Sequence, residues 1–215
     1  MTPDFEYFLR MKILSYYSHT LAGLFYFCLP IGVLTAFIFH NIIKEHLLAN
    51  LPKIINARLH SISKIDWNNY FKSNWLTVLS SILLGAISHL AWDACTHHNG
   101  FFVNNSAWLS SEFQLFHLEV KGYKILQHLS TLVGGLIILL TIFRLPKTPI
   151  KQTITIEYWL LLGSIGSIIV GLRFLNGLSF NLQGLGTFVA TSIAALFISL
   201  VVTPLIMNVK KKIVL

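Results

Sequence analysis

The sequence predicts an all-α membrane protein, a polytopic helical bundle with about five transmembrane helices in a single membrane domain over residues 1–215. Two observations predict this class. Hydrophobic residues make up 54% of the chain and charged residues 11%, with a mean hydropathy of +0.68, whereas a soluble domain carries about 25% charged residues. Apolar runs near the roughly 20 residues that cross a hydrocarbon core recur along the chain. This composition excludes a soluble monomer and a disordered chain.

The predicted spans are separated by polar segments. They lie near residues 21–39, 75–92, 129–143, 158–175 and 185–207. The third run is short, so we expect its helix to include polar neighbours at one end. Pro30 is expected to kink the first helix, because proline has no amide hydrogen to donate. Small residues such as Gly163 and Ser167 allow membrane helices to approach closely, which is typical of a compact bundle.

Basic residues are unevenly distributed between the predicted loops. The net charge of +8 reflects a scarcity of acids, with 16 Lys and Arg against 8 Asp and Glu, and the scatter of basic residues between apolar runs argues against a nucleic-acid partner. Eleven of the 16 basic residues fall in segments 40–74, 144–157 and 208–215. Because positive residues favour the cytoplasmic side, we expect a multi-pass protein of the cell (inner, cytoplasmic) membrane with a cytoplasmic C-terminus and an outer N-terminus.

Ionisable residues within the second predicted span indicate a metal site. His89, Asp93 and His97 stand at i, i+4 and i+8 and therefore share one helix face. Histidine and aspartate are common ligands of zinc and other borderline divalent metals, and ionisable groups inside a span are usually functional. The alternative, a polar helix end at the interface, explains His97 more easily than His89. One ion bound by all three would require the helix to loosen near Thr96; a neighbouring pair or two ions are the other options.

Other polar residues are expected at the same membrane face. Asp4 and Glu6 lie in the first turn of an N-terminal helix, where the helix dipole alone could explain Glu6. His19 precedes the first span and His128 precedes the third. With the predicted orientation, these residues and the polar end of the second helix converge at the outer face. Arg173, near the outer end of the fourth helix, is either a snorkelling anchor or a clamp for an anionic substrate.

Four motifs occur in a defined order: TPDFEYF, SHT, SHLAWDACTHHNG and GYKILQHLSTLVG. In this combination the chain resembles a bacterial family of membrane proteins, domain-of-unknown-function family 4184, which is distantly similar to membrane-bound metal-dependent hydrolases. The motif residues that the resemblance implies are functional are Asp4, Glu6, His19, His89, Asp93, His97, Gln127, His128 and Ser130. Family members usually begin some tens of residues earlier, with Ser-His-Pro, which implies that this chain is a fragment or starts late and lacks one histidine ligand.

We therefore expect a metal-dependent hydrolase that acts at the membrane interface on an ester or phosphoester. A divalent metal, zinc in the first place, would be held by some of His19, His89, Asp93 and His97, with Asp4 as a further candidate ligand, and would lower the pKa of a bound water towards about 7. We expect membrane lipid to surround the protein and the substrate to be a small molecule or a lipid. The sequence does not indicate the oligomeric state.

The remaining candidate residues have expected roles in the reaction. Asp4 or Glu6 would serve as the general base, His128 would orient a ligand or stabilise developing charge, and Arg173 would bind a substrate phosphate. The alternative is a non-enzymatic membrane protein, either a metal or proton pathway or a structural helical bundle. Polar groups gathered at one face favour a site over a pathway, which would need them at several depths.

Overall fold

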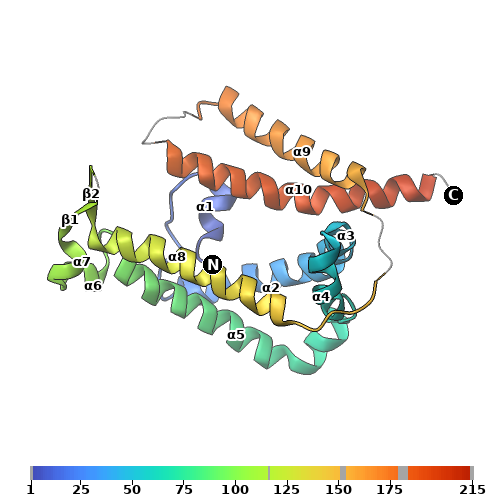
Figure 1. The fold of residues 1–215 in the computed structure, drawn as a ribbon, viewed down its shortest axis with the longest axis horizontal. Coiled ribbons are helices and arrows are strands. Elements are labelled where there is room, and N and C mark those ends of the chain that lie inside the picture. Colours follow the sequence, from blue (N-terminus) through green and yellow to red (C-terminus); the bar gives the residue numbers. More distant parts are fainter. Residues whose placement is uncertain (1, 116, 151–153, 179–183, 214–215) are drawn as a thin grey trace.

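The computed structural model describes residues 2–115, 117–150, 154–178 and 184–213. The chain is mostly helical and contains one small hairpin (Figure 1). Its first half consists of α1 (Phe5–Arg10), η1 (Leu24–Cys28), α2 (Leu29–Ile38), η2 (Phe39–Ile43), α3 (Lys44–Asn50), α4 (Lys53–Ser63) and α5 (Trp67–Thr96). Its second half consists of α6 (Phe101–Asn104), α7 (Ala107–Ser110), β1 (Glu112–Leu115), β2 (Leu118–Lys121), α8 (Gly122–Arg144), α9 (Ile156–Leu175) and α10 (Leu185–Ile213).

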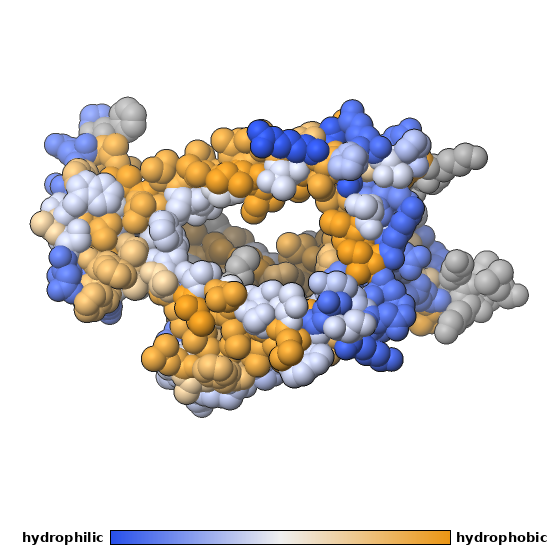
Figure 2. Space-filling model, turned by 90° about the horizontal axis from the view of Figure 1, so that it is seen from below, coloured by the Kyte–Doolittle hydropathy of each residue, from blue (hydrophilic) through white to orange (hydrophobic). Residues whose placement is uncertain are grey.

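Within the described ranges, five helical segments are long and apolar enough to cross a membrane, which confirms the predicted class. They are Leu24–Asn50, Trp67–Asn104, Gly122–Arg144, Ile156–Leu175 and Leu185–Lys210. Hydrophobic residues form a band across the middle of the molecule, and hydrophilic residues gather at its two ends (Figure 2). This distribution fits a multi-pass protein whose apolar side chains face lipid.

The boundaries of the helices differ from those of the apolar runs. The first helical segment begins at Leu24 rather than at residue 21 and continues beyond residue 39 to Asn50. A wider, π-type turn, η1, directly precedes α2, and Pro30 stands in the first turn of α2; such turns accommodate a disrupted hydrogen-bond ladder. As expected, the third span includes polar neighbours at one end: α8 begins at Gly122 and contains Lys124 and Gln127 before its apolar run.

The long helices form two layers that the N-terminal segment connects (Figure 1). Helix α9 packs along α10, and α10 contacts α1, where the rings of Phe5 and Phe197 stack at 5.4 Å. In the other layer α5 contacts both α2 and α8, and Trp92 Nε1 donates a hydrogen bond to Ser130 Oγ at 3.3 Å. The hairpin of β1 and β2, with Glu112 opposite Lys121, connects the short helices after α5 to α8.

A close contact at Gly32 brings α2 and α5 together. A Cβ atom added there would lie 2.7 Å from Ile82 Cγ2, whereas one at Gly85 would meet nothing within 4 Å. We expect Gly32→Val to destabilise the fold by about 1–3 kcal/mol through overpacking, measured as a lower thermal unfolding midpoint in detergent. Gly85→Val is the matched control with the same added volume; equal losses in both variants would contradict this packing.

Candidate metal centre

Asp4 is placed by the short helix that begins the described chain. Asp4 immediately precedes α1, and its carbonyl accepts a hydrogen bond from the amide of Tyr7 at 2.9 Å. Its side chain makes no capping hydrogen bond to that helix. The carboxylate instead faces two imidazoles, those of His19 and His89. The N-terminal helix therefore directs Asp4 towards the interior of the N-terminal half.

Glu6 organises the loop that carries His19. Its buried carboxylate accepts hydrogen bonds from the amides of Tyr16, Tyr17 and Ser18 at 3.0, 3.0 and 2.9 Å. It also accepts from Ser15 Oγ at 2.9 Å and forms an ion pair with Arg10 at 2.9 Å. Burial alone would raise the pKa of Glu6, but these backbone and hydroxyl donors outweigh it and lower the pKa below its ordinary value.

His19 is held in one orientation by its own loop. Its Nδ1 lies 3.0 Å from both Ser15 Oγ and Ser18 Oγ. The ring of Tyr7 stacks on the imidazole, with centroids 5.1 Å apart. Because these contacts occupy Nδ1 and one ring face, Nε2 is the nitrogen presented to Asp4 and to Asp93.

Helix α5 contributes His89 and Asp93 from consecutive turns. Ala86, one turn earlier, is buried against Leu24 and Cys28 of η1. This packing holds the face of α5 that carries His89 against the N-terminal part of the chain. The predicted sharing of one helix face by His89 and Asp93 therefore brings both side chains to the Asp4 and His19 segments.

The four side chains form a closed ring of alternating imidazole and carboxylate groups. His89 Nε2 lies 3.2 Å from Asp4 Oδ2 and 3.3 Å from Asp93 Oδ2. His19 Nε2 lies 3.6 Å from Asp4 Oδ1 and 3.6 Å from Asp93 Oδ2. Donor atoms of Asp4, His19 and His89 all lie within 4.8 Å of one another. The side chains are 18–23% exposed, so solvent and a small group can reach them.

The spacing of these atoms is compatible with a shared cation. His89 Nε2 is buried and has no hydrogen-bond partner with acceptable geometry among the described residues, although two carboxylates are near. Protein hydrogen bonds of this type are mostly about 2.7–3.2 Å long. Two ligands of a tetrahedral zinc ion, each bound at about 2.0–2.1 Å, lie roughly 3.3 Å apart. The separations of Asp4 from His89 and from His19, 3.2 and 3.6 Å, are therefore close to those between two ligands of one ion.

Neighbouring groups shift the pKa values of Asp4 and Tyr7 at the ring. Burial alone would raise the pKa of Asp4, but the imidazoles of His19 and His89 outweigh it and lower the pKa well below its ordinary value. Burial, together with the negative charges of Asp4, Asp93 and Glu6, raises the pKa of Tyr7. Asp4 is therefore a carboxylate at neutral pH, which is the form that binds a cation.

The other predicted site residues lie at or beyond the edge of this ring. His97 is the residue at which α5 ends, in an extended conformation, so the helix does loosen after Thr96. Its Nδ1 lies 3.4 Å from Asp93 Oδ1, and its side chain is 55% exposed. Among the described residues, Asp93 and His97, both expected as metal ligands, lie outside the group that could share one ion, which consists of Asp4, His19 and His89.

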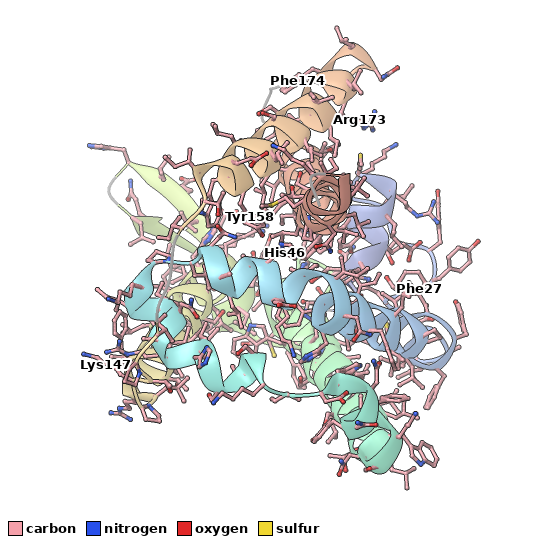
Figure 3. The ribbon with its side chains drawn as sticks, turned by 90° about the vertical axis from the view of Figure 1, so that its right-hand side faces the viewer. Phe27, His46, Lys147, Tyr158, Arg173 and Phe174 are labelled. Carbon is pink, nitrogen blue, oxygen red and sulfur yellow. The ribbon has the colours of Figure 1, made fainter. Side chains whose placement is uncertain are left out.

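Glu6, His128 and Arg173 are not in contact with the ring. The carboxylate of Glu6 is occupied by the 15–18 loop and by Arg10, which favours a structural role over that of a base. His128 is exposed on α8. Arg173 lies on α9, on the far side of α10 from α2 (Figure 3), and donates to the carbonyl of Asn176 at 3.3 Å. The roles predicted for these residues are therefore not supported by proximity.

Sequence reasoning overlooked the supporting residues Tyr7, Ser15 and Ser18. Tyr7 stands three residues after Asp4, so helical spacing could have placed it on the same face. The two serines contact both Glu6 and His19. Their role depends on the path of an irregular loop, for which the sequence offers no periodic signal.

A comparison with protein families identifies the chain. The family model described as Domain of unknown function (DUF4184) matches residues 1–205, so the chain belongs to this family and the resemblance found in its motifs is confirmed. No curated protein and no solved structure matches the chain. These comparisons therefore lend no support to the similarity with membrane-bound metal-dependent hydrolases, which stays a prediction.

Proposed function

We propose that this member of the DUF4184 family is a metal-dependent hydrolase that acts at the membrane interface on an ester or phosphoester. The observation that carries the proposal is the convergence of Asp4, His19 and His89, whose donor atoms lie within 4.8 Å of one another although they come from three separate segments. Two imidazoles and one carboxylate form a donor set that zinc uses in hydrolytic sites, where a fourth position stays open. Zinc is therefore the first candidate.

Each residue of the ring has a role in this proposal. Asp4, His19 and His89 hold the cation, and Ser15 and Ser18 hold His19 so that Nε2 faces it. When bound, the cation lowers the pKa of a water molecule and polarises the substrate oxygen. Asp93 Oδ2 accepts the proton of the attacking water as general base. His97 Nδ1, 3.4 Å from Asp93 Oδ1 and more exposed, passes that proton to solvent.

An apolar groove beside the ring supports a lipid as the substrate. The groove has a volume of about 470 Å³ and lies between the N-terminal segment, α2 and α5. Its lining includes Phe5, Gly32, Ala36, Ile82, Gly85 and Ala86. Phe5 follows Asp4 directly, and Gly85 and Ala86 lie one turn before His89. An acyl chain in this groove would place the adjoining ester at the ring.

Hydrolysis of p-nitrophenyl esters and of bis(p-nitrophenyl) phosphate by the zinc-loaded chain in detergent tests the proposal. Because general-base catalysis contributes about 10²–10⁴-fold, we expect Asp93→Asn to lower turnover at least about 100-fold while zinc stays bound. His98→Ala is the matched control, since His98 follows His97 in the sequence and its Nδ1 contacts Asn99. Zinc binding without turnover of either substrate would instead support the non-enzymatic alternative.

A further inference from the structure

A second polar pocket lies at the other end of the helical layer that holds the ring. Its volume is about 780 Å³, and its lining includes His40, Asn41, Lys44, Glu45, His46 and Asn208. His40 stacks on Trp67, the first residue of α5, with centroids 4.3 Å apart. His89 follows 22 residues after Trp67 in α5, which is kinked at Asn74, and each helical residue adds about 1.5 Å of rise. The polar pocket is therefore distant from the ring, although His40 also lines the apolar groove between α2 and α5.

Lys44 places an incompletely bonded ammonium group in this pocket. The residue is 6% exposed, and its Nζ donates a hydrogen bond to the carbonyl of Ile65 at 2.7 Å. An ammonium group has three N–H donors. Within the described ranges no carboxylate pairs with Lys44. A buried charge without a counter-ion is costly, so the pocket is suited to an anion.

The neighbouring side chains add further hydrogen-bonding groups to the pocket. His40 Nδ1 is buried and has no hydrogen-bond partner in the described part of the chain. His46 Nε2 lies 3.0 Å from Asn208 Oδ1 and thereby connects α3 to the end of α10; Figure 3 shows His46 between these helices. Imidazole and amide donors around one ammonium are the groups that bind phosphate oxygens.

Glu45 gives the pocket a second, opposite charge near solvent. Glu45 is exposed, whereas Lys44 beside it is buried. Among residues whose placement is described, Glu45 forms no ion pair. A ligand that carries a phosphate at its inner end and a cation at its outer end would match both charges. Because the pocket lies at the end of the apolar segment Leu24–Asn50, a membrane lipid is the natural source of such a ligand.

We propose that this pocket binds the phosphoethanolamine headgroup of a phospholipid, with the phosphodiester at Lys44 and the terminal ammonium at Glu45. The shared chemistry is a phosphate ester that carries a primary ammonium group, which also occurs in soluble O-phosphoethanolamine. The lipid is the favoured source because Ile42 and Met207 line the same pocket and provide apolar contacts for its glycerol region.

Native mass spectrometry of the full chain, purified in detergent and stripped of lipid, tests this proposal. The probes are phosphatidylethanolamine and phosphatidylglycerol with identical acyl chains, and O-phosphoethanolamine. We expect wild-type protein to retain phosphatidylethanolamine about fivefold better than phosphatidylglycerol, the difference that one surface charge makes. Lys44→Met should weaken binding of both lipids at least about tenfold, as loss of a charged hydrogen-bond donor does.

Two further variants keep the test decisive. Glu45→Gln, at an exposed position, should keep its fold and bind the two lipids equally. Lys53→Met, at an exposed lysine of the neighbouring helix α4, should behave as wild type. Equal binding of the two lipids by wild type, or an unchanged preference in Glu45→Gln, would overturn the proposal even if Lys44→Met does not fold. Binding of O-phosphoethanolamine as tight as that of the lipid would overturn the lipid assignment.

Discussion

His89→Ala is expected to weaken zinc binding by more than about 100-fold, because even residues that only support metal ligands are worth about 10–100-fold in affinity. His89 Nε2 is the atom closest to both carboxylates of the ring, at 3.2 and 3.3 Å. Asp4→Asn should have a similar effect, since a neutral amide replaces the carboxylate that faces both imidazoles. A competition titration against a zinc-chelating dye, in detergent, measures both affinities.

Two histidine controls separate this effect from a general loss of imidazole. His98→Ala removes an imidazole just beyond the end of α5 that carries His89; its Nδ1 contacts Asn99 Oδ1 at 2.8 Å. His46→Ala removes the imidazole on α3 whose Nε2 contacts Asn208 Oδ1. Both should leave zinc affinity unchanged. Zinc affinity that falls equally in all of these variants, or that survives in His89→Ala, would show that the ring is not the binding site.

Glu6→Gln is expected to destabilise the protein by about 3 kcal/mol, the scale of removing hydrogen bonds to a buried charged group. The carboxylate accepts hydrogen bonds from the three backbone amides of residues 16–18. In the glutamine variant one of these oxygens is replaced by an NH2 group, which cannot accept a hydrogen bond from these amides. The loop that holds His19 should loosen as a result. We therefore expect both a lower unfolding midpoint and weaker zinc binding.

The reaction of Cys28 with a thiol-specific dye during heating measures this loss. Cys28 is fully buried, and its Sγ contacts the carbonyl of Ser18 at 3.5 Å, so labelling reports opening of this region. A Cys95→Ala background removes the other cysteine. Glu119→Gln, at an exposed acid of β2, is the matched control. An unfolding midpoint in Glu6→Gln equal to that of the control would contradict the structural role assigned to Glu6.

Membrane spans are the part of the fold that the sequence predicts best. Their signal is local, because apolar residues must occupy the hydrocarbon core whatever their neighbours are. Helix ends are less predictable. Helix α8 begins at the buried Gly122 and includes the polar Lys124 and Gln127 before its apolar run, and the first span continues through polar residues to Asn50. Contacts between distant segments determine these ends.

Only part of the candidate site can be predicted from the sequence. His89 and Asp93 share a face through helical spacing, which can be read from the sequence. Their meeting with Asp4 and His19 depends on the packing of η1 against α5 and on the loop around Glu6, whose partners lie 10–12 residues further along the chain. The general-base role expected of Asp4 or Glu6 stays a prediction, and the carboxylate of Glu6 is occupied by contacts with residues 15–18 and Arg10.

The X-ray absorption spectrum of the zinc-loaded wild-type chain tests the central claim most directly. One bound zinc ion, surrounded by nitrogen and oxygen at about 2.0–2.1 Å with the multiple-scattering features of two imidazoles, is the expected result. Weaker imidazole features in the spectrum of His19→Ala would assign one of the two imidazole ligands to His19. A sulfur ligand at about 2.3 Å, or a shell of oxygen atoms without imidazole, would contradict a centre built from Asp4, His19 and His89.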